Sequence, residues 1–382
     1  MKYKIINRKK LYATMLADII GNLLFLPKRL LTKKEEIIPD AIKEILVVRT
    51  AYTGDAMMTV PMLRPLKERF VNARLSFLTS TGAGELLRGS PYIDEIITYD
   101  PFWFYNSAKG DYMEFISGLK RKSFDLVIEA RGDIRELLLI VYPLKARFRV
   151  SYGFGGGSYV LTHCVPYREM KHRIEYHLDL ARSIGCKTEN AEWGIYLSAE
   201  EKKKAADVLE SHGIRKPFIS VHAGGRLPLK RWITDRYALL YDKLKEKYDL
   251  PIVMLGSKEE QGQAAEITNK MKHTPFLMAG KLTIRELAAV LSESALFVCN
   301  DSAPMHIAAA MKTPTVAIFG PSKSIETAPY GNAHRVVEKD FPCRYACDES
   351  SCRFSRYHAC MGDIEVNDVL HAVKDLFEET RT

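Results

Sequence analysis

The sequence predicts an α/β protein with two doubly wound parallel sheets. Short apolar runs alternate with helix-like segments in two successive series of about 150 residues each. This alternation is typical of parallel strands that helices cover on both faces. The 382 residues suffice for two domains with separate cores. A charged fraction of 27% and an aromatic fraction of 10% argue against wholesale disorder.

The expected strands of the first series are residues 45–49, 74–80, 95–99, 125–130 and 148–152, and helices are expected over 55–70 and 132–142. In the second series the expected strands are 218–223, 251–256, 276–280, 296–299 and 315–319, separated by helices over 234–248, 258–271, 284–293 and 302–311. A boundary is expected within 190–215, near a Lys/Glu-rich helix over 200–211, and a last helix over 366–380. The domains are therefore predicted as 1–44, a basic N-terminal segment, 45–200 and 201–382.

The N-terminal segment carries more than half of the excess charge. Residues 1–44 hold ten Lys/Arg and five Asp/Glu, which gives +5 of the total +9. The remaining +4 is too weak a field for a general nucleic-acid binder, so no nucleic-acid partner is expected. Residues 11–26 are too short to span a bilayer. Their apolar residues recur at helical spacing between basic clusters, which fits a helix on an anionic membrane surface, a helix docked on the protein body, or the start of a signal peptide.

A polar loop follows the first expected strand and runs from Arg49 through Thr53 and Gly54 to Asp55. Ligands bind outside the carboxyl ends of strands in open α/β sheets, so the loop is well placed for chemistry. It has neither the dinucleotide-binding glycines nor a P-loop. Asp55 is either the N-cap of the next helix or a general base for a hydroxyl nucleophile, and spacing alone favours the cap.

Three strand ends of the second series carry small or phosphate-compatible residues. His222 lies near the end of one strand, Gly224 and Gly225 follow that strand, and Lys230 comes shortly after them. Small residues allow close approach of a ligand and a lysine can meet a phosphate, although Lys230 also fits a solvated surface charge, and Trp232 fits a packing residue. Gly320 ends another strand.

The segment after residue 299 reads Asn-Asp-Ser-Ala-Pro-Met-His and opens an alanine-rich helix. Asp301 or Ser302 is expected as its N-cap, with Ala303 next and His306 on the first turn. The helix N-terminus is suited to a diphosphate, but a well-capped buried helix with a core histidine explains the pattern equally well. The chain has no D-x-D pair of the kind that commonly clamps a metal on a nucleotide diphosphate.

Four of the seven cysteines, Cys343, Cys347, Cys352 and Cys360, stand close together at C-x3-C-x4-C-x7-C spacing. This is not a standard zinc ribbon. Three alternatives remain, namely a structural Zn or Fe site, free thiols, or disulfides, and a reducing cytosol disfavours the last.

Several of these motifs, taken in order, resemble the heptosyltransferases of lipopolysaccharide assembly, glycosyltransferase family nine. The resemblance covers residues 44–375 and rests on the Gly54-Asp55 loop, the Gly-Ser-Pro-Tyr-Ile-Asp-Glu-Ile segment at 89–96, the motifs at 220–224 and 230–232, Asp-Ser-Ala-Pro-Met-His at 301–306, Phe-Gly-Pro-Ser at 319–322, and the cysteines. It implies a GT-B fold, with two Rossmann-like domains facing across a cleft, acceptor bound by the first and nucleotide-sugar by the second.

The resemblance also implies an inverting, metal-independent transfer that needs no cofactor. Asp55 aligns with the family's proposed general base and Lys230 with the lysine facing the diphosphate. Asp301 falls where the family contacts the sugar, and Ser302, Ala303 and His306 fall at the start of its phosphate-binding helix. The other expected donor contacts are His222, Gly224, Gly225 and Gly320, and the expected acceptor contacts are Arg49, Thr53, Gly54, Arg131 and Arg135. Ala303 stands where the family often has Gly, an apolar residue often stands where this chain has Thr53, and Arg135 fits a surface helix charge equally well.

The expected function is transfer of a heptose from ADP-heptose to a lipid-linked lipopolysaccharide core acceptor. The expected location is cytoplasmic, peripheral at the inner face of the cytoplasmic membrane, with an anionic membrane surface as a partner. The alternatives are another nucleotide-sugar or a protein acceptor, and a non-catalytic membrane-associated relative. The presence of Asp55, Lys230 and Asp301 speaks against the last.

Overall fold

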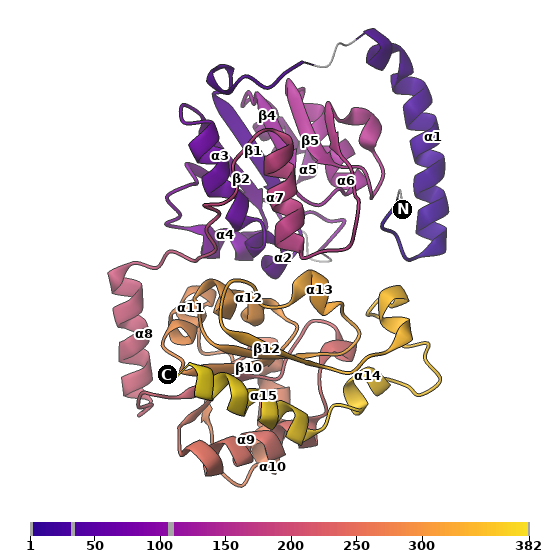
Figure 1. The fold of residues 1–382 in the computed structure, drawn as a ribbon. Helices are drawn as coiled ribbons and strands as arrows, with labels where there is room; N and C mark the ends of the chain where they lie inside the picture. The colour runs from indigo at the N-terminus through magenta and orange to yellow at the C-terminus, as the bar shows by residue number, and fades with distance from the viewer. Residues whose placement is uncertain (1–2, 32–34, 106–110, 381–382) are drawn as a thin grey trace. The chain divides into compact units, whose positions relative to one another are not determined.

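The computed structural model describes residues 3–31, 35–105 and 111–380. The chain divides into two compact units, Met1–Trp193 and Gly194–Thr382, and each contains a parallel sheet flanked by helices (Figure 1). The division lies inside the interval 190–215, and the Lys/Glu-rich helix that follows it belongs to the second unit. The predicted α/β class with two doubly wound sheets is confirmed.

The sheet of unit 1 has six parallel strands in the order β3-β2-β1-β4-β5-β6. In chain order they are β1 (Glu44–Arg49), β2 (Arg74–Thr79), β3 (Glu95–Thr98), β4 (Leu126–Glu129), β5 (Phe148–Tyr152) and β6 (His163–Val165). Five were predicted from their continuous apolar runs, which is the pattern of strands buried on both faces. The edge strand β6 was missed because its three residues include an exposed cysteine and form no apolar run.

The helices of unit 1 are α1 (Arg8–Leu31), α2 (Thr53–Met57), α3 (Leu63–Arg69), α4 (Thr81–Leu87), α5 (Tyr112–Lys120), α6 (Ile134–Glu136) and α7 (Arg173–Ser183). The single helix predicted over 55–70 is wrong, because a 3-10 turn containing Pro61 separates α2 from α3. The helix predicted over 132–142 starts as α6 and continues as a π-helical turn over Leu137–Val141.

The sheet of unit 2 has the order β12-β11-β10-β7-β8-β9. Its strands are β7 (Ile219–His222), β8 (Ile252–Met254), β9 (Phe276–Leu277), β10 (Leu296–Asn300), β11 (Thr315–Phe319) and β12 (His334–Glu338). Strand β12 was not predicted, because it is a polar edge strand whose residues are mostly only half-buried.

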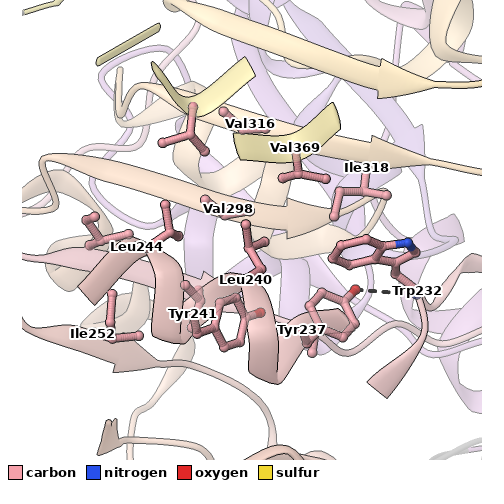
Figure 2. Close-up of a cluster of buried hydrophobic side chains, with 14 of the residues drawn as sticks. Trp232, Tyr237, Leu240, Tyr241, Leu244, Ile252, Val298, Val316, Ile318 and Val369 are labelled. Carbon is pink, nitrogen blue, oxygen red and sulfur yellow. Dashed lines mark hydrogen bonds between the residues drawn. The ribbon is translucent and has the colours of Figure 1, made fainter. Parts of the chain in front are cut away.

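The helices of unit 2 are α8 (Ala199–Ser211), α9 (Thr234–Tyr248), α10 (Gln261–Lys270), α11 (Ile284–Ser292), α12 (Ala303–Ala310), α13 (Ser324–Thr327), α14 (Ala359–Gly362) and α15 (Val366–Glu379). Figure 2 shows the core between the sheet, α9 and α15, where Trp232 packs beside Tyr237. The Trp232 indole N–H donates to the carbonyl of Ile364 at 3.0 Å, which confirms the predicted packing role.

Strand order reverses once in each sheet. In unit 1 the chain moves from β1 toward β3 and then resumes at β4 on the other side of β1; in unit 2 the reversal lies between β7 and β10. The loops after β1 and β4, and those after β7 and β10, therefore diverge at a topological switch point, where open α/β sheets bind ligands. The strand pairing brings Val48 level with Glu129 and His222 level with Cys299.

Helix α1 is attached to unit 1 by one face. The Asp18 carboxylate is 2% exposed and accepts from the Tyr3 hydroxyl and the Gly157 amide, both at 2.7 Å. A Cβ at Gly21 would lie 2.2 Å from the Tyr159 ring, so the helix touches the body here. The docked alternative is thus observed.

The predicted apolar stripe of α1 nevertheless faces away from the body. Six of its residues, Met15, Leu16, Ile19, Ile20, Leu23 and Leu24, are exposed, and the seventh, Leu11, is half-buried. Tyr12 and Leu26, which were not part of the predicted stripe, are exposed as well. Among the residues of the basic clusters, Lys2, Lys33 and Lys34 lie outside the described residues, as do the side chains of Lys28 and Arg29. None of the described helices combines the length and the apolar character needed to cross a membrane.

Candidate active site

The Asp55 carboxylate lies in the loop that follows β1, at the switch point of unit 1. Helix α2 begins at Thr53 with Tyr52 as its N-cap, so Asp55 lies within the first turn and the N-cap interpretation is wrong. One carboxylate oxygen contacts the Arg173 guanidinium at the start of α7, and the other lies 3.3 Å from Arg49 Nη2. The Asp55 side chain is 14% exposed, so this cluster is shielded but open on one side.

The arginines keep Asp55 ionised. Burial alone would raise the pKa of its carboxyl, but Arg173, Arg49 and then Arg131 lower it well below the ordinary aspartate value. Asp55 is therefore an anion at neutral pH with a reduced affinity for a proton. A general base here is available at any pH near neutrality, and its strength depends on how tightly the arginines hold it.

The backbone before Asp55 is strained. Tyr52 has a φ of +50°, in the left-handed region that non-glycine residues rarely occupy. Its amide donates to the Tyr105 hydroxyl at 2.9 Å, and that hydroxyl donates to the carbonyl of Thr50 at 3.2 Å. A residue more than fifty positions away thus fixes the loop, and such strain is concentrated at functional sites.

A pair of fully buried carboxyl groups lies beneath this loop. Glu129, at the end of β4, accepts from the amides of Arg131 at 2.9 Å and Gly132 at 2.6 Å. Glu136, on α6, accepts from the Thr50 amide at 3.1 Å and from its hydroxyl. Burial and the neighbouring Glu136 raise the pKa of Glu129 well above the ordinary glutamate value. The raised pKa favours a neutral Glu129, whose proton could then be shared with the Glu136 carboxylate and join the loop after β1 to the loop after β4.

Two of the predicted acceptor arginines follow β4, Arg131 in the loop and Arg135 in the short helix α6. Arg135 binds Asp133 through two nitrogens, at 2.9 and 2.7 Å, and its guanidinium lies 4.5 Å from the ring centre of Phe104. Arg131 stacks on the same ring at 4.2 Å. Arg135 is thus an anchored guanidinium, 43% exposed, rather than a freely solvated charge.

Lys230 is the central cation of unit 2. Its Nζ lies 2.8 Å from Asp301 Oδ2 and 2.8 Å from Glu349 Oε2. Burial alone would lower the pKa of Lys230, but the two carboxylates raise it. For Asp301, which is 5% exposed, burial alone would raise the pKa, but Lys230 and then His306 lower it. Lys230 is therefore a paired, partly buried cation, not the solvated surface charge that the sequence also allowed.

His222, at the end of β7, links the loops that follow β7, β8 and β10. Its Nε2 lies 3.0 Å from Glu260, and its Nδ1 lies 3.3 Å from the Ser302 hydroxyl. Glu260 also accepts from the Gly225 amide at 2.9 Å. Burial alone would raise the pKa of Glu260, but His222 and the backbone donors lower it to about 2. A Cβ at Gly224 would lie 1.9 Å from Glu260 Oε1, so this glycine admits a carboxylate of the protein itself.

Helix α12 begins where the sequence predicts, and an anion site at its N-terminus stays a prediction. Ser302 is the N-cap in extended conformation, its side chain makes no capping hydrogen bond, and Pro304 lies in the first turn. His306 lies on the first turn and is 6% exposed. Gly320 adjoins Met361, whose Cγ would lie 2.6 Å from an added Cβ.

All seven cysteines are free thiols, so the structure contains none of the disulfides that the sequence also allowed. Burial and then the charges of Cys343, Cys347 and Cys352 raise the pKa of Cys360 to about 11, so the four sulfurs share one loop. Across residues 3–31, 35–105 and 111–380, no three His, Cys, Asp or Glu side chains are placed to hold a metal ion. The Zn or Fe alternative stays a prediction, which metal analysis of anaerobically purified protein tests.

The structure gathers Arg49, Gly54, Asp55 and Arg131 at the switch point of unit 1, and His222, Lys230, Asp301 and Ser302 at that of unit 2. Sequence reasoning missed Arg173, Glu260 and Glu349. Arg173 had a signal, since it begins a helix at the carboxyl edge of the sheet. The other two stand in acidic surface-like runs and offered none.

Comparison with known proteins identifies the family of this chain. The model of glycosyltransferase family 9 (heptosyltransferase) matches residues 112–358, well over half of the chain. Lipopolysaccharide heptosyltransferase 3 of Escherichia coli K12 is 24% identical over 347 residues, which are 86% of this chain and 96% of that protein.

Two solved structures share the fold. A glycosyl transferase of family 9 from Veillonella parvula has a TM-score of 0.76 at 21% identity, covering 90% of this chain and 99% of that one. The ADP-heptose lipopolysaccharide heptosyltransferase II of Escherichia coli has a TM-score of 0.71 at 22% identity, covering 89% and 100%. The chain belongs to glycosyltransferase family 9 and is a glycosyltransferase of the heptosyltransferase type.

Proposed function

We propose that this enzyme transfers a heptose from ADP-heptose to a lipid-linked lipopolysaccharide core acceptor, with inversion and without a catalytic metal. The observation that carries the proposal is the pairing of opposite charges at the two switch points. Asp55 is an ionised carboxylate among arginines, and Lys230 is a cation beside the start of α12. The name of the related Escherichia coli structure, an ADP-heptose lipopolysaccharide heptosyltransferase, supports the choice of donor and acceptor.

In the proposed reaction, Asp55 accepts the proton of the acceptor hydroxyl as its oxygen forms the bond to the anomeric carbon. The bond from that carbon to the diphosphate breaks, and the electron pair leaves with ADP. Lys230 and the positive dipole end of α12 stabilise the charge that develops on the diphosphate. A cation and a helix N-terminus serve the purpose that a divalent metal serves in other nucleotide-sugar enzymes.

The remaining candidate residues divide between the two substrates. Asp301, Ser302, Ala303, His306 and Gly320 serve the donor, with His222, Gly224 and Gly225 shaping the adjacent loop. Arg49, Thr53, Gly54, Arg131 and Arg135 serve the acceptor, and their positive charge suits an acidic or phosphorylated sugar. We propose that residues 45–200 bind the acceptor and residues 201–382 bind the donor.

The test is a transfer assay with purified full-length enzyme, ADP-heptose and a lipid-linked core acceptor. We expect ADP release and glycosylated lipid in equal amounts, undiminished by a chelator, with an inverted anomeric configuration in the product by NMR. Turnover of UDP- or GDP-sugars would show that the proposed donor is wrong, and glycosylation of a protein would show that the proposed acceptor is wrong. The absence of both binding and turnover would favour a non-catalytic relative.

We also propose that α1 holds the enzyme at the inner face of the cytoplasmic membrane, on an anionic surface. Its exposed apolar side chains include Leu16, Ile20 and Leu24, which are 60%, 51% and 73% exposed. Arg8, Lys9 and Lys10 lie exposed at its start. An apolar face with basic ends is the composition of an interfacial helix.

The triple variant Leu16→Gln, Ile20→Gln, Leu24→Gln tests the membrane proposal. We expect it to bind phosphatidylglycerol-containing vesicles about tenfold or more weakly than the wild type, in a sedimentation assay. The matched control replaces Ile38, Val71 and Met113 by Gln, which are exposed elsewhere on unit 1. Equal vesicle binding by the two variants would contradict the assignment of α1 as the membrane contact.

A further inference from the structure

The cysteine-rich loop, residues 343–360, contacts the turn that carries Lys230 at two points. Glu349 Oε2 lies 2.8 Å from Lys230 Nζ. His358 Nε2 lies 2.7 Å from the carbonyl oxygen of Leu229, the residue before the lysine. Both contacts lie inside unit 2 and reach across more than a hundred residues of sequence. The loop is therefore part of the surroundings of the donor-side lysine.

Two cysteines hold the loop in this shape. The amide of Glu349 donates to Cys347 Sγ at 3.4 Å, and the amide of His358 donates to Cys352 Sγ at 3.3 Å. Glu349 and His358 both have a positive φ, +64° and +56°. Non-glycine residues occupy this region only where the surroundings fix them, so the loop turns sharply at the two residues that touch the Lys230 turn.

The two carboxylates on Lys230 differ in how firmly they are held. Asp301 stands at the end of β10 and is 5% exposed. Glu349 stands on the loop and is 25% exposed. A lysine ammonium has three donors, and these carboxylates occupy two of them. A diphosphate that binds Lys230 brings like charge close to both, and Glu349 is the one with room to move away.

We propose that Glu349 is a placeholder for the donor diphosphate, holding Lys230 in the empty donor site and lowering the affinity for donor by competing for that lysine. The proposal rests on the proposed contact between Lys230 and the diphosphate. It gives the cysteine-rich loop a role in donor binding that needs no metal. Donor binding replaces the carboxylate of Glu349 by phosphate oxygens on Lys230, with no covalent change.

The test is calorimetric titration of the full-length enzyme with ADP and, separately, with adenosine. Glu349→Gln removes the competing charge and keeps the shape of the side chain. We expect it to bind ADP about two- to fivefold more tightly than the wild type, the range of a partly exposed ion pair. Its affinity for adenosine, which has no phosphate, stays unchanged. Asp340→Asn is the matched control, since Asp340 is exposed and the same net charge is lost.

The outcomes separate this inference from the proposed function. A wild type that binds UDP or GDP but not ADP overturns the proposed nucleotide, and the same comparison is then made with the diphosphate that binds. If the wild type binds ADP while Glu349→Gln binds it equally or more weakly, the placeholder role is wrong. Tighter binding of ADP by Asp340→Asn to the same extent would show a general charge effect and would also overturn it.

Discussion

The two switch points of this enzyme are opposites in charge. At the end of β1 an anion, Asp55, is surrounded by cations, whereas near the end of β7 a cation, Lys230, is held between anions. In both places the partners stabilise the charged form of the central residue. The difference lies in what a substrate must displace. In the proposed reaction, an acidic acceptor would be attracted by the arginines that also hold Asp55, whereas a diphosphate would compete with the carboxylates that already bind the lysine.

The sharpest test of the switch point in unit 1 is the variant Asp55→Asn. We expect transfer to fall by about 10²- to 10⁴-fold, because the variant keeps the shape of the side chain but cannot accept the proton. ADP affinity should stay at the wild-type value, because Asp55 belongs to the other unit. Initial-rate kinetics and ADP titration measure the two quantities. Substantial transfer by a well-folded Asp55→Asn enzyme would remove Asp55 as the base.

The variant Lys230→Gln tests the switch point in unit 2. We expect ADP affinity and the transfer rate to fall by about 10- to 100-fold, the worth of a charge-assisted hydrogen bond. The variant also leaves Asp301 without its cation, so the melting temperature is measured in parallel. Lys258→Gln is the control, because Lys258 is an exposed lysine of the same unit. An unchanged affinity for ADP in Lys230→Gln would place the diphosphate elsewhere.

Arg173→Gln weakens the surroundings of Asp55 without removing the carboxylate. Because Arg173 lowers the pKa of Asp55, the variant should raise that pKa toward the ordinary value. The acid limb of the pH–rate profile should therefore move to higher pH, with a change of less than about tenfold in rate at neutral pH. The low pKa of Asp55 also stabilises the fold. This contribution is complete above the pKa that Asp55 has in the unfolded chain, and it is lost as the pH falls through the lower pKa of the folded state. An acid limb that does not move would show that Asp55 is not the group that titrates.

The smallest effect is expected from Glu136→Gln, beneath the loop that carries Asp55. The raised pKa of Glu129 means that its proton stabilises the fold below the unfolded pKa, and that this stability is lost as the pH rises toward the folded pKa. A glutamine can donate to an ionised Glu129 and still accept from the Thr50 amide. The free energy of unfolding of the Glu136→Gln variant, from urea titrations at pH 5 and pH 8, should therefore depend less on pH than that of the wild type.

Glu136→Leu provides the contrast for that experiment. It leaves the Thr50 amide without its acceptor and should cost about 1–3 kcal/mol at both pH values. A wild type and a glutamine variant with identical pH dependence would rule out the shared proton.

The strands and the order of the motifs could be predicted from the sequence because they depend on local patterns. Buried parallel strands are continuous apolar runs, and β5 and β11 were predicted with their observed bounds. The polar edge strand β12 lacks this signal. The prediction of a single helix over 55–70 was wrong for a local reason that is visible in the sequence, because Pro61 interrupts the helix.

The charged partners could not be predicted, because each comes from a distant part of the chain. Arg173 meets Asp55 across 118 residues, and Glu349 meets Lys230 from a loop that the cysteine spacing alone did not orient. The surroundings of Gly224 could not be predicted either, because the space beside it is filled by the carboxylate of Glu260, which follows another strand. A donor contact at Gly224 stays a prediction.

Gly21 offers a way to uncouple α1 from catalysis. Any side chain at this position would collide with the Tyr159 ring, while the exposed apolar face of α1 would be unaltered. A bulky residue there should weaken the docking of α1, which the hydrogen bond from the Gly157 amide to Asp18 opposes, and leave the side chains proposed to contact lipid in place. Comparing such an enzyme on vesicle-bound and detergent-dispersed acceptor would show whether the anchor supplies local concentration alone, or also a fixed orientation at the bilayer.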